Sequence, residues 1–503
     1  MTEPNRTGFP DATAGRLQRL PPSAVGTVDS TVANGYRLPL ATARVPRLGP
    51  RDDLSRAPLS FQQEWWWKYF EIFGPRLNAR FCAVALRIRG RLDIEALRHS
   101  IQHVVQHHES LRTRIVVVEG RPAQEIDRAP NSALEVINVF VSGDAAPESE
   151  ARRLIEELVN LPIDVSVGPL FGARLLRIAD HDHVLAVAMN HVISDHMSEH
   201  ILLRDVWTAY VQLVQQRPVS LAEMPIQFPD YAAWQRRTHE IWTATHGSYW
   251  ATRLHNAPCQ RFPIDGGEGA AARFRTEQLP VSFGNRLTEG LRNFSRHTRT
   301  TLVMTVLTAY AASLLRWQER RELIVGLLVT GRNRPQLENT IGFLASVLYL
   351  RIELKPGDTF LELLRRVTQE FCTAYLHCDS ARLSVPVPGP DFKRCTTVNW
   401  LPRTDQGEGA LSELQGSPYS IELEPFSYRN CAFDIEWDVE SAGLLGDPGL
   451  LLSDTPGGIS GYMHYRSDQF RRPTIERLCG NLRDFSKRLL DDPNAVIETV
   501  KYN

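Results

Sequence analysis

The sequence predicts an α/β (α+β) fold in two halves of similar pattern. Short apolar runs with strand periodicity alternate with stretches whose apolar residues recur at helical spacing, and this happens on both sides of a polar connection at 218–275. The chain has 503 residues, 43% of them hydrophobic and 23% charged, which suffices for more than one globular unit. We therefore expect two folded lobes, at residues 51–265 and 266–503.

Residues 1–50 differ from the rest of the chain. They are rich in Pro, Thr, Ala, Gly and Arg and offer few apolar side chains to a core. This composition predicts a flexible N-terminal extension, with a segment that lies against the folded body as the alternative.

The first half is expected to become ordered near Pro58. Ser60 and Gln63 have the spacing of a capping box, which starts a helix. Apolar runs on either side of a polar turn at 179–183 predict a strand hairpin. In order, the predicted elements are a helix from Ser60, a strand at 80–91, a helix from Asp93, a strand at 112–118, the hairpin over 171–193, and a helix after a loop at 190–197.

The second half follows the polar connection, for which we predict one or two short helices, including Tyr231–Thr238. The glycine-rich stretch 266–269 marks an exposed loop between the halves. The predicted elements beyond it are a helix at 299–318, a strand at 322–330, a loop and strand over 339–354, a helix capped by Thr359 and Glu362, strands near 395–401, 419–425, 430–439 and 458–466, and a helix from Pro473.

Charge and cysteine content exclude several classes of function. The chain carries 57 basic and 58 acidic residues, so no basic excess points to nucleic acid or to an anionic membrane. Seven cysteines without a Cys-x-x-Cys pair indicate reduced thiols rather than a disulfide framework. No signal-peptide core and no apolar run of about 18 residues occurs. We therefore expect a cytoplasmic protein.

The strongest candidate site is the segment Asn190–His196, because the usual phosphate-loop, nucleophile-elbow and dinucleotide motifs are absent. Here a predicted strand ends in polar residues just before a helix begins. A helix N-terminus offers positive potential, and a neutral histidine such as His191 can take a proton from an amine or hydroxyl. Asp195 is placed either to orient His191 or to cap the helix.

Two other interpretations of this segment stay open at this point. In the first, Asp195 only caps the helix while His191 packs at the strand end. In the second, His191, Asp195 and His196 bind a metal ion, with His181 and His183 as further ligands. The second is weakly supported, because neither an H-E-x-x-H pattern nor a set of cysteine ligands occurs, and we expect no metal.

Two further clusters look chemical at first sight. His107-His108-Glu109 resembles a catalytic group, but His108 continues an apolar helix face, so a buried structural histidine is expected. The tryptophans at 65–67 cannot share one helix face, so one or two of them are expected in the core, with a ligand-stacking site as the alternative.

A series of short motifs runs in a fixed order from about residue 58 to the C-terminus. The stretches are Leu59–Glu64, Arg89–Leu97, His108–Thr113, Asn190–His196, Tyr231–Gln235, Ile341–Arg351 and Tyr465–Leu478. In order and spacing they resemble the motifs of non-ribosomal peptide synthetase condensation domains, within the chloramphenicol-acetyltransferase-like superfamily. Asn190–His196 corresponds to H-H-x-x-x-D-G in that family.

The resemblance implies two acetyltransferase-like lobes in a V shape with a tunnel between them. It also implies a donor thioester on the phosphopantetheine arm of a carrier protein, attacked by an amine or a hydroxyl. His191 would then lie at the reaction centre, and Asp195 would pair with an arginine of the other lobe, for which Arg332 is the candidate. Asn399 would be a polar residue that faces the tunnel.

Departures from the family motifs mark further candidates for substrate contact. Asn190 stands in place of the first His and His196 in place of the Gly, while Ser346 and Val347 replace an Asn-Thr pair. Together with Ser194 and Asn399, the residues Asn190, His196 and Ser346 are the predicted substrate-binding set.

From the resemblance we expect a stand-alone condensation enzyme that forms an amide or ester, because no adenylation domain and no carrier motif is evident. Its partners would be an acyl or peptidyl carrier protein in trans and a small amine or alcohol acceptor, with no cofactor of its own. A monomer is expected. The alternatives are a non-catalytic recruitment protein and an epimerase or coenzyme A-dependent acyltransferase.

Overall fold

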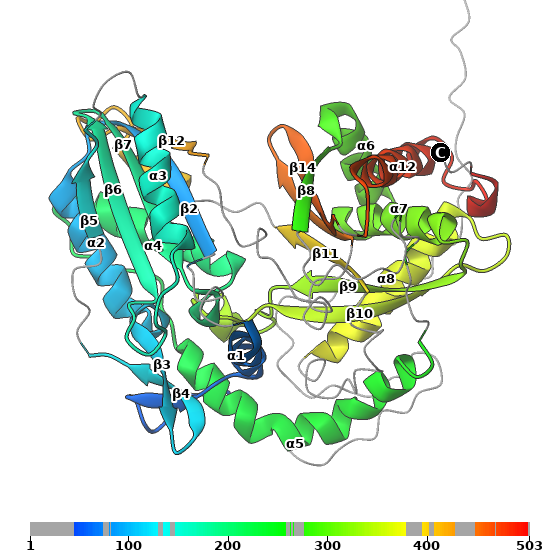
Figure 1. Ribbon diagram of the computed structural model, residues 1–503, viewed down its shortest axis with the longest axis horizontal. Coiled ribbons are helices and arrows are strands. Elements are labelled where there is room, and N and C mark those ends of the chain that lie inside the picture. The colour runs from blue at the N-terminus through cyan, green and yellow to red at the C-terminus, as the bar shows by residue number, and fades with distance from the viewer. Residues whose placement is uncertain are drawn as a thin grey trace, which may run out of the picture. The chain divides into compact units, whose positions relative to one another are not determined.

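The structure is a computed structural model that describes residues 45–73, 80, 82–128, 134–140, 146–257, 262, 265, 276–378, 395–401, 407–427, 448–467 and 469–500. Helices and strands alternate along these segments, and the strands form three sheets, so the predicted mixed α/β class is confirmed. Figure 1 shows the elements and their labels. The predicted strand at 430–439, the glycine-rich loop at 266–269 and residues 1–44 of the predicted extension lie outside the described residues.

A five-stranded sheet forms the core of the N-terminal half. Its strand order is β12 (Ile421–Pro425), β2 (Cys82–Gly90), β7 (Asp182–Met189), β6 (Phe171–Ala179) and β5 (Leu134–Asn138). Alternate residues of β7 face opposite sides. Leu185 and Val187 join the core with α2 (Ile94–His107) and α4 (His196–Val214), while Val184 and Ala186 pack with α3 (Pro147–Asn160). Helices therefore cover both faces of this sheet.

Strand β12 comes from the second half of the sequence but pairs with β2 of the first. The two strands are antiparallel, from Ile421 opposite Gly90 to Pro425 opposite Leu86. The short helix α11 (Glu408–Leu411) precedes β12 and packs against α4. The sheet of the N-terminal half thus includes chain from beyond the expected boundary at residue 265.

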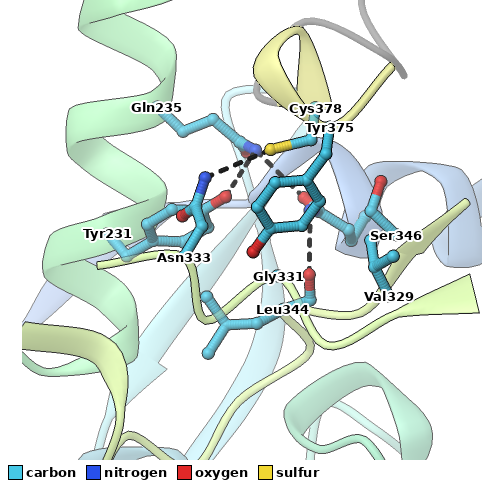
Figure 2. A pocket seen from close by; sticks show the side chains of 10 residues that line it. Tyr231, Gln235, Val329, Gly331, Asn333, Leu344, Ser346, Tyr375 and Cys378 are labelled. Carbon is cyan, nitrogen blue, oxygen red and sulfur yellow. Dashed lines mark hydrogen bonds between the residues drawn. The ribbon is translucent and has the colours of Figure 1, made fainter. Parts of the chain in front are cut away.

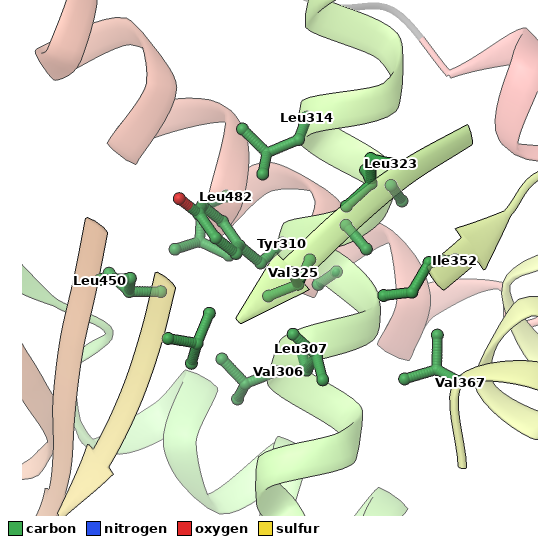
Figure 3. Close-up of a cluster of buried hydrophobic side chains, with 14 of the residues drawn as sticks. Val306, Leu307, Tyr310, Leu314, Leu323, Val325, Ile352, Val367, Leu450 and Leu482 are labelled. Carbon is green, nitrogen blue, oxygen red and sulfur yellow. The ribbon is translucent and has the colours of Figure 1, made fainter. Parts of the chain in front are cut away.

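A six-stranded sheet forms the core of the C-terminal half. Its order is β10 (Ser346–Glu353), β9 (Glu322–Val329), β11 (Thr396–Leu401), β13 (Gly449–Thr455), β14 (Gly458–Arg466) and β8 (Thr276–Ser282). The helices that share its hydrophobic core are α6 (Gly284–His297), α7 (Leu302–Trp317), α8 (Phe360–Leu376) and α12 (Arg472–Asp491). Figure 3 shows Val306, Leu307 and Tyr310 of α7 against Val325 of β9 at the centre of this core.

Helix α5 (Phe228–Arg253) replaces the one or two short helices predicted for the polar connection. It is a single helix of 26 residues, and most of its buried side chains lie in its first three turns. The remaining turns are largely polar, so they lack the apolar stripe by which a helix is recognised from sequence. Trp250 at its far end is nonetheless fully buried in the core of the C-terminal half.

The N-terminal elements lie on α5. Strand β1 (Arg56–Pro58) pairs with β4 (Arg121–Ile126), which pairs with β3 (Thr113–Val118), and α1 (Phe61–Phe73) follows. The carbonyl of Pro46 accepts a hydrogen bond from the indole of Trp234 at 2.7 Å, and Arg51 forms an ion pair with Asp230 at 2.7 Å. Residues 45–51 therefore lie against the folded body.

Local signals in the sequence predicted several element boundaries correctly. Ser60 and Gln63 form the predicted capping box, with backbone-to-side-chain bonds of 2.9 and 3.1 Å, and Thr359 caps α8 in the same way. The strand predicted to reach Ile193 ends at Met189 instead, because the Asn190 side chain caps a 3-10 turn there. Helices α3 and α6 were not predicted, since polar residues predominate in both.

Candidate functional site

The segment Asn190–His196 is a compact loop between β7 and α4. Asn190 accepts a hydrogen bond from the backbone nitrogen of Val192 at 2.9 Å, and the Ser194 hydroxyl donates to the carbonyl of Asn190 at 2.9 Å. Both side chains are fully buried. These two predicted substrate-binding residues therefore hold the backbone of the loop.

One hydrogen bond fixes the tautomer of His191. Its Nδ1 lies 2.7 Å from the carbonyl oxygen of Ser194. Because a carbonyl oxygen only accepts, Nδ1 carries the hydrogen, and Nε2 of the neutral imidazole carries the lone pair. Nε2 can therefore accept a proton or a hydrogen bond. The predicted alternative in which Asp195 orients His191 through Nδ1 is not the observed arrangement.

Two aromatic side chains hold the imidazole of His191 in place. The ring centroid of Trp66 in α1 lies 4.9 Å from that of His191, and the centroid of Phe343 lies 4.3 Å away. Phe343 is buried just ahead of β10, and Trp66 is partly buried. Of the three tryptophans at 65–67, the middle one thus packs beside the candidate catalytic residue, which sequence reasoning did not predict.

Asp195 is the N-cap of α4 and is 2% exposed. Its carboxylate accepts hydrogen bonds from the backbone nitrogen and the hydroxyl of Ser198, at 3.0 and 2.8 Å. The backbone nitrogens of Leu344 and Ala345 donate to its other oxygen at 3.1 and 3.0 Å. Burial alone would raise the pKa of Asp195, but the charge and hydrogen bonds of Arg332, with those of Ser198, lower it below its ordinary value.

Arg332 reaches this carboxylate from the C-terminal half. Its two terminal nitrogens each lie 2.9 Å from one carboxylate oxygen, in a bidentate ion pair. The residue before it, Gly331, has φ +68, and a Cβ there would lie 1.9 Å from the carbonyl oxygen of Leu344. Only glycine fits this turn after β9, which brings Arg332 to Asp195.

His196 takes part in a small cluster at the start of α4. Its Nδ1 lies 3.3 Å from the carboxylate of Glu199, and its Nε2 lies 3.0 Å from Nε2 of His200. Burial opposes protonation, yet the neighbouring Glu199 carboxylate raises the pKa of His196 above its ordinary value. Burial and the adjacent His196 lower the pKa of His200 to about 4. A protonated His196 can therefore donate to both neighbours.

A pocket lies among α1, α5, β9, β10 and α8, with about 420 Å³ of empty space including the part open to solvent. Figure 2 shows its lining. Ser346 is part of this lining, together with Leu344, Gly331 and Asn333. Asn399 is not among the lining residues and lies on β11, opposite Leu451 of β13. Of the predicted substrate-binding set, Ser346 is therefore the member that faces a pocket.

The other titratable candidates have structural surroundings. His108 is 1% exposed and lies 2.8 Å from the carboxylate of Asp205, so the predicted buried structural histidine is confirmed. His181 is exposed in the hairpin turn, whereas His183 is buried in β7. Within the described segments, no group of three or more His, Cys, Asp or Glu side chains is arranged to hold a metal ion. None of the described helices combines the length and apolarity needed to cross a membrane.

The family model described as "Condensation domain" matches residues 54–380, which include the loop, Arg332, Phe343 and the pocket lining. The chain belongs to the condensation-domain family. It is 30% identical over 480 residues to one of the proteins that make up linear gramicidin synthase in Brevibacillus parabrevis. That match covers 93% of this chain but 9% of the relative, so the chain spans a small part of that protein's length.

Solved structures show the same fold with different printed roles. The X-domain in its complex with OxyB from teicoplanin biosynthesis has a TM-score of 0.73 and 21% identity, covering 92% of this chain and 99% of that chain. The epimerization domain of the third module of tyrocidine synthetase B has a TM-score of 0.71 and 19% identity, covering 90% and 99%. Likeness at this identity shows the fold, and the function rests on the site.

Proposed function

We propose that this protein joins an acyl or aminoacyl thioester, carried on the phosphopantetheine arm of a carrier protein, to an amine or hydroxyl acceptor. The product is an amide or an ester of a non-ribosomal natural product. The observation that carries the proposal is the hydrogen bond from Nδ1 of His191 to Ser194, because it leaves the lone pair on Nε2. Membership of the condensation-domain family supports the reaction type.

In this reaction the nucleophile attacks the carbonyl carbon of the thioester. A C–N or C–O bond forms, the C–S bond breaks, and the thiol of the carrier arm leaves. The proton lost by the nucleophile passes to Nε2 of His191 and then to the departing thiolate. Proton transfer of this kind contributes about 10²–10⁴-fold to a rate, and alignment of the two substrates contributes further.

Asp195 and Arg332 have a supporting role in this mechanism. Their charges are consumed by each other and by neighbouring hydrogen bonds, so neither is available to a substrate. The pair instead joins the start of α4 to the segment that carries Phe343, and Phe343 packs on His191. His191 is therefore the proposed catalytic residue, and Asp195 and Arg332 are positioning residues.

The test is intact-mass spectrometry of acyl-loaded carrier proteins mixed with a panel of amines and alcohols. The carriers are supplied as separate chains, so the assay also asks whether the reaction runs in trans. Wild type is expected to unload a carrier into a new amide or ester, and His191→Ala is expected to slow this about 10²–10⁴-fold. Equal unloading by both proteins would show that His191 is not the catalyst.

Recruitment of another protein is the second candidate function. Asn190 and His196 favour it, since they stand where the family motif has His and Gly. The X-domain of similar fold is itself known in a complex with OxyB. A recruiter would bind its partner equally well as wild type and as His191→Ala and would unload no carrier.

A further inference from the structure

The pocket beside the reaction loop has one continuous hydrogen-bonded wall. Gln235 donates to the hydroxyl of Tyr231 at 3.2 Å and to the side-chain oxygen of Gln62 at 3.1 Å. Gln62 in turn donates to the carbonyl of Leu344 at 3.5 Å. Figure 2 shows this chain of bonds across the pocket. The wall is therefore held in one arrangement before any ligand arrives.

This pocket adjoins the residues that hold His191. Gln62 lies one helical turn before Trp66 on α1, and Leu344 directly follows Phe343. Trp66 and Phe343 are the two rings that pack against His191. A group bound in the pocket would therefore belong to a molecule that reaches the reaction loop.

The described residues that line the pocket include no charged side chain, although two arginines lie in the same segment. Arg332 is bound by Asp195, and the guanidinium of Arg334 lies over the ring of Trp234, 4.7 Å from its centroid. A charged ligand group would thus enter a partly enclosed space without an ion partner, at a large desolvation cost. The lining excludes charge rather than selecting it.

The lining does offer hydrogen bonds to a neutral group. Ser346 is 7% exposed, and its hydroxyl bonds to no group in the described part of the chain. The thiol of Cys378, which accepts a bond from Asn333 at 3.2 Å, lies on the same lining. A buried hydroxyl normally finds a partner, so a ligand group that bonds to Ser346 would complete this site.

We propose that this pocket binds a small, uncharged, hydrogen-bonding group of the substrate, such as a carboxamide. This inference rests on the proposed function and names the substrate class that the site accepts. Leucine, asparagine and aspartate side chains have similar size and differ in polarity and charge. Among their thioesters, the asparaginyl compound is expected to bind and the other two are not.

The thiol of Cys378 provides a readout that does not depend on turnover. The protein is treated with iodoacetamide in the presence of asparaginyl-, aspartyl- or leucyl-N-acetylcysteamine, and the labelled peptides are quantified by mass spectrometry. At ten times its Kd, the asparaginyl thioester is expected to slow labelling of Cys378 about tenfold. Cys372, which is exposed on α8 and absent from the lining, is the matched control and should label at an unchanged rate.

The serine variant tests the specific contact. Ser346→Ala is expected to raise the Kd of the asparaginyl thioester about 2–10-fold and to leave labelling without ligand unchanged. Equal protection by the aspartyl or leucyl thioester would overturn the proposal. So would the absence of protection by the asparaginyl thioester, or the failure of Cys378 to react with iodoacetamide at all.

The two proposals fail in different ways. If the asparaginyl thioester protects Cys378 but no carrier is unloaded, the substrate class stands and the condensation reaction fails. If carriers are unloaded while charged acyl groups are used as well as neutral ones, the reaction stands and the substrate class fails.

Discussion

Arg332 and Asp195 lie 137 residues apart in sequence and form a buried bidentate ion pair with two N–O distances of 2.9 Å. Their side chains are 5% and 2% exposed. The loop with His191 comes from the N-terminal half and the ring of Phe343 from the C-terminal half. This pair therefore ties together the two parts of the chain from which the candidate site is made.

Removing the arginine should strongly destabilise the protein. Arg332→Met leaves the Asp195 carboxylate buried without its ion partner, which costs about 3–5 kcal/mol in the free energy of unfolding. Urea denaturation measures this change. The control is Lys487→Met, which breaks an exposed pair with Asp484 and should cost no more than about 1 kcal/mol. Similar losses in both variants would show that the buried pair has no special role.

The hydroxyl of Ser198 should set the position of Phe343 against His191. It is fully buried, donates to Asp195 at 2.8 Å and accepts a bond from the backbone nitrogen of Gly342 at 3.1 Å. Ser198→Ala removes the acceptor for Gly342, at an expected cost of about 1–3 kcal/mol. The neighbouring Phe343 should then shift, and NMR should show the Hε1 resonance of His191 moving as the ring current on it changes.

Ser486→Ala is the matched control for this experiment. Ser486 is also fully buried, and its hydroxyl bonds to the carbonyl of Leu482 within α12, far from the loop in sequence. It should leave the His191 resonance unchanged. An unchanged resonance in Ser198→Ala as well would mean that Phe343 is held without the Ser198 hydroxyl.

Local patterns predicted local structure well, and long-range contacts poorly. The capping box at Ser60 involves residues three apart, so its spacing is visible in the sequence. The packing of Trp66 and Phe343 on His191 joins three distant segments, and no periodicity encodes it. Only the order of family motifs pointed to Arg332 as the partner of Asp195. Asn190 and Ser194 were predicted to face substrate, but their polar groups satisfy the loop backbone, which spacing alone does not reveal.

His196 should give the protein a pH-dependent contribution to stability. The pKa of His196 is raised above 6.5, mainly by Glu199, so its stabilising effect is present below pH 6.5 and is lost as the pH rises through the folded pKa. His196→Ala should therefore lower the Tm more at pH 6 than at pH 9. Glu199→Gln should show the same pattern, since it removes the partner. An equal loss of Tm at both pH values would exclude the ion pair as the cause.

Three buried histidines should make the fold sensitive to acid. Burial lowers the pKa of His200, His377 and His464 to about 4, compared with 6.5 in the unfolded chain. Since the unfolded chain binds more protons between these values, stability is complete above pH 6.5 and falls as the pH drops towards 4. Each histidine contributes about 1.4 kcal/mol per pH unit in this window. Urea denaturation of His464→Leu between pH 7 and pH 4.5 should show a slope smaller by one proton, whereas replacement of the exposed His255 by Leu should leave it unchanged. If the slope is the same in wild type and His464→Leu, His464 is protonated in the folded protein and its burial has no such effect.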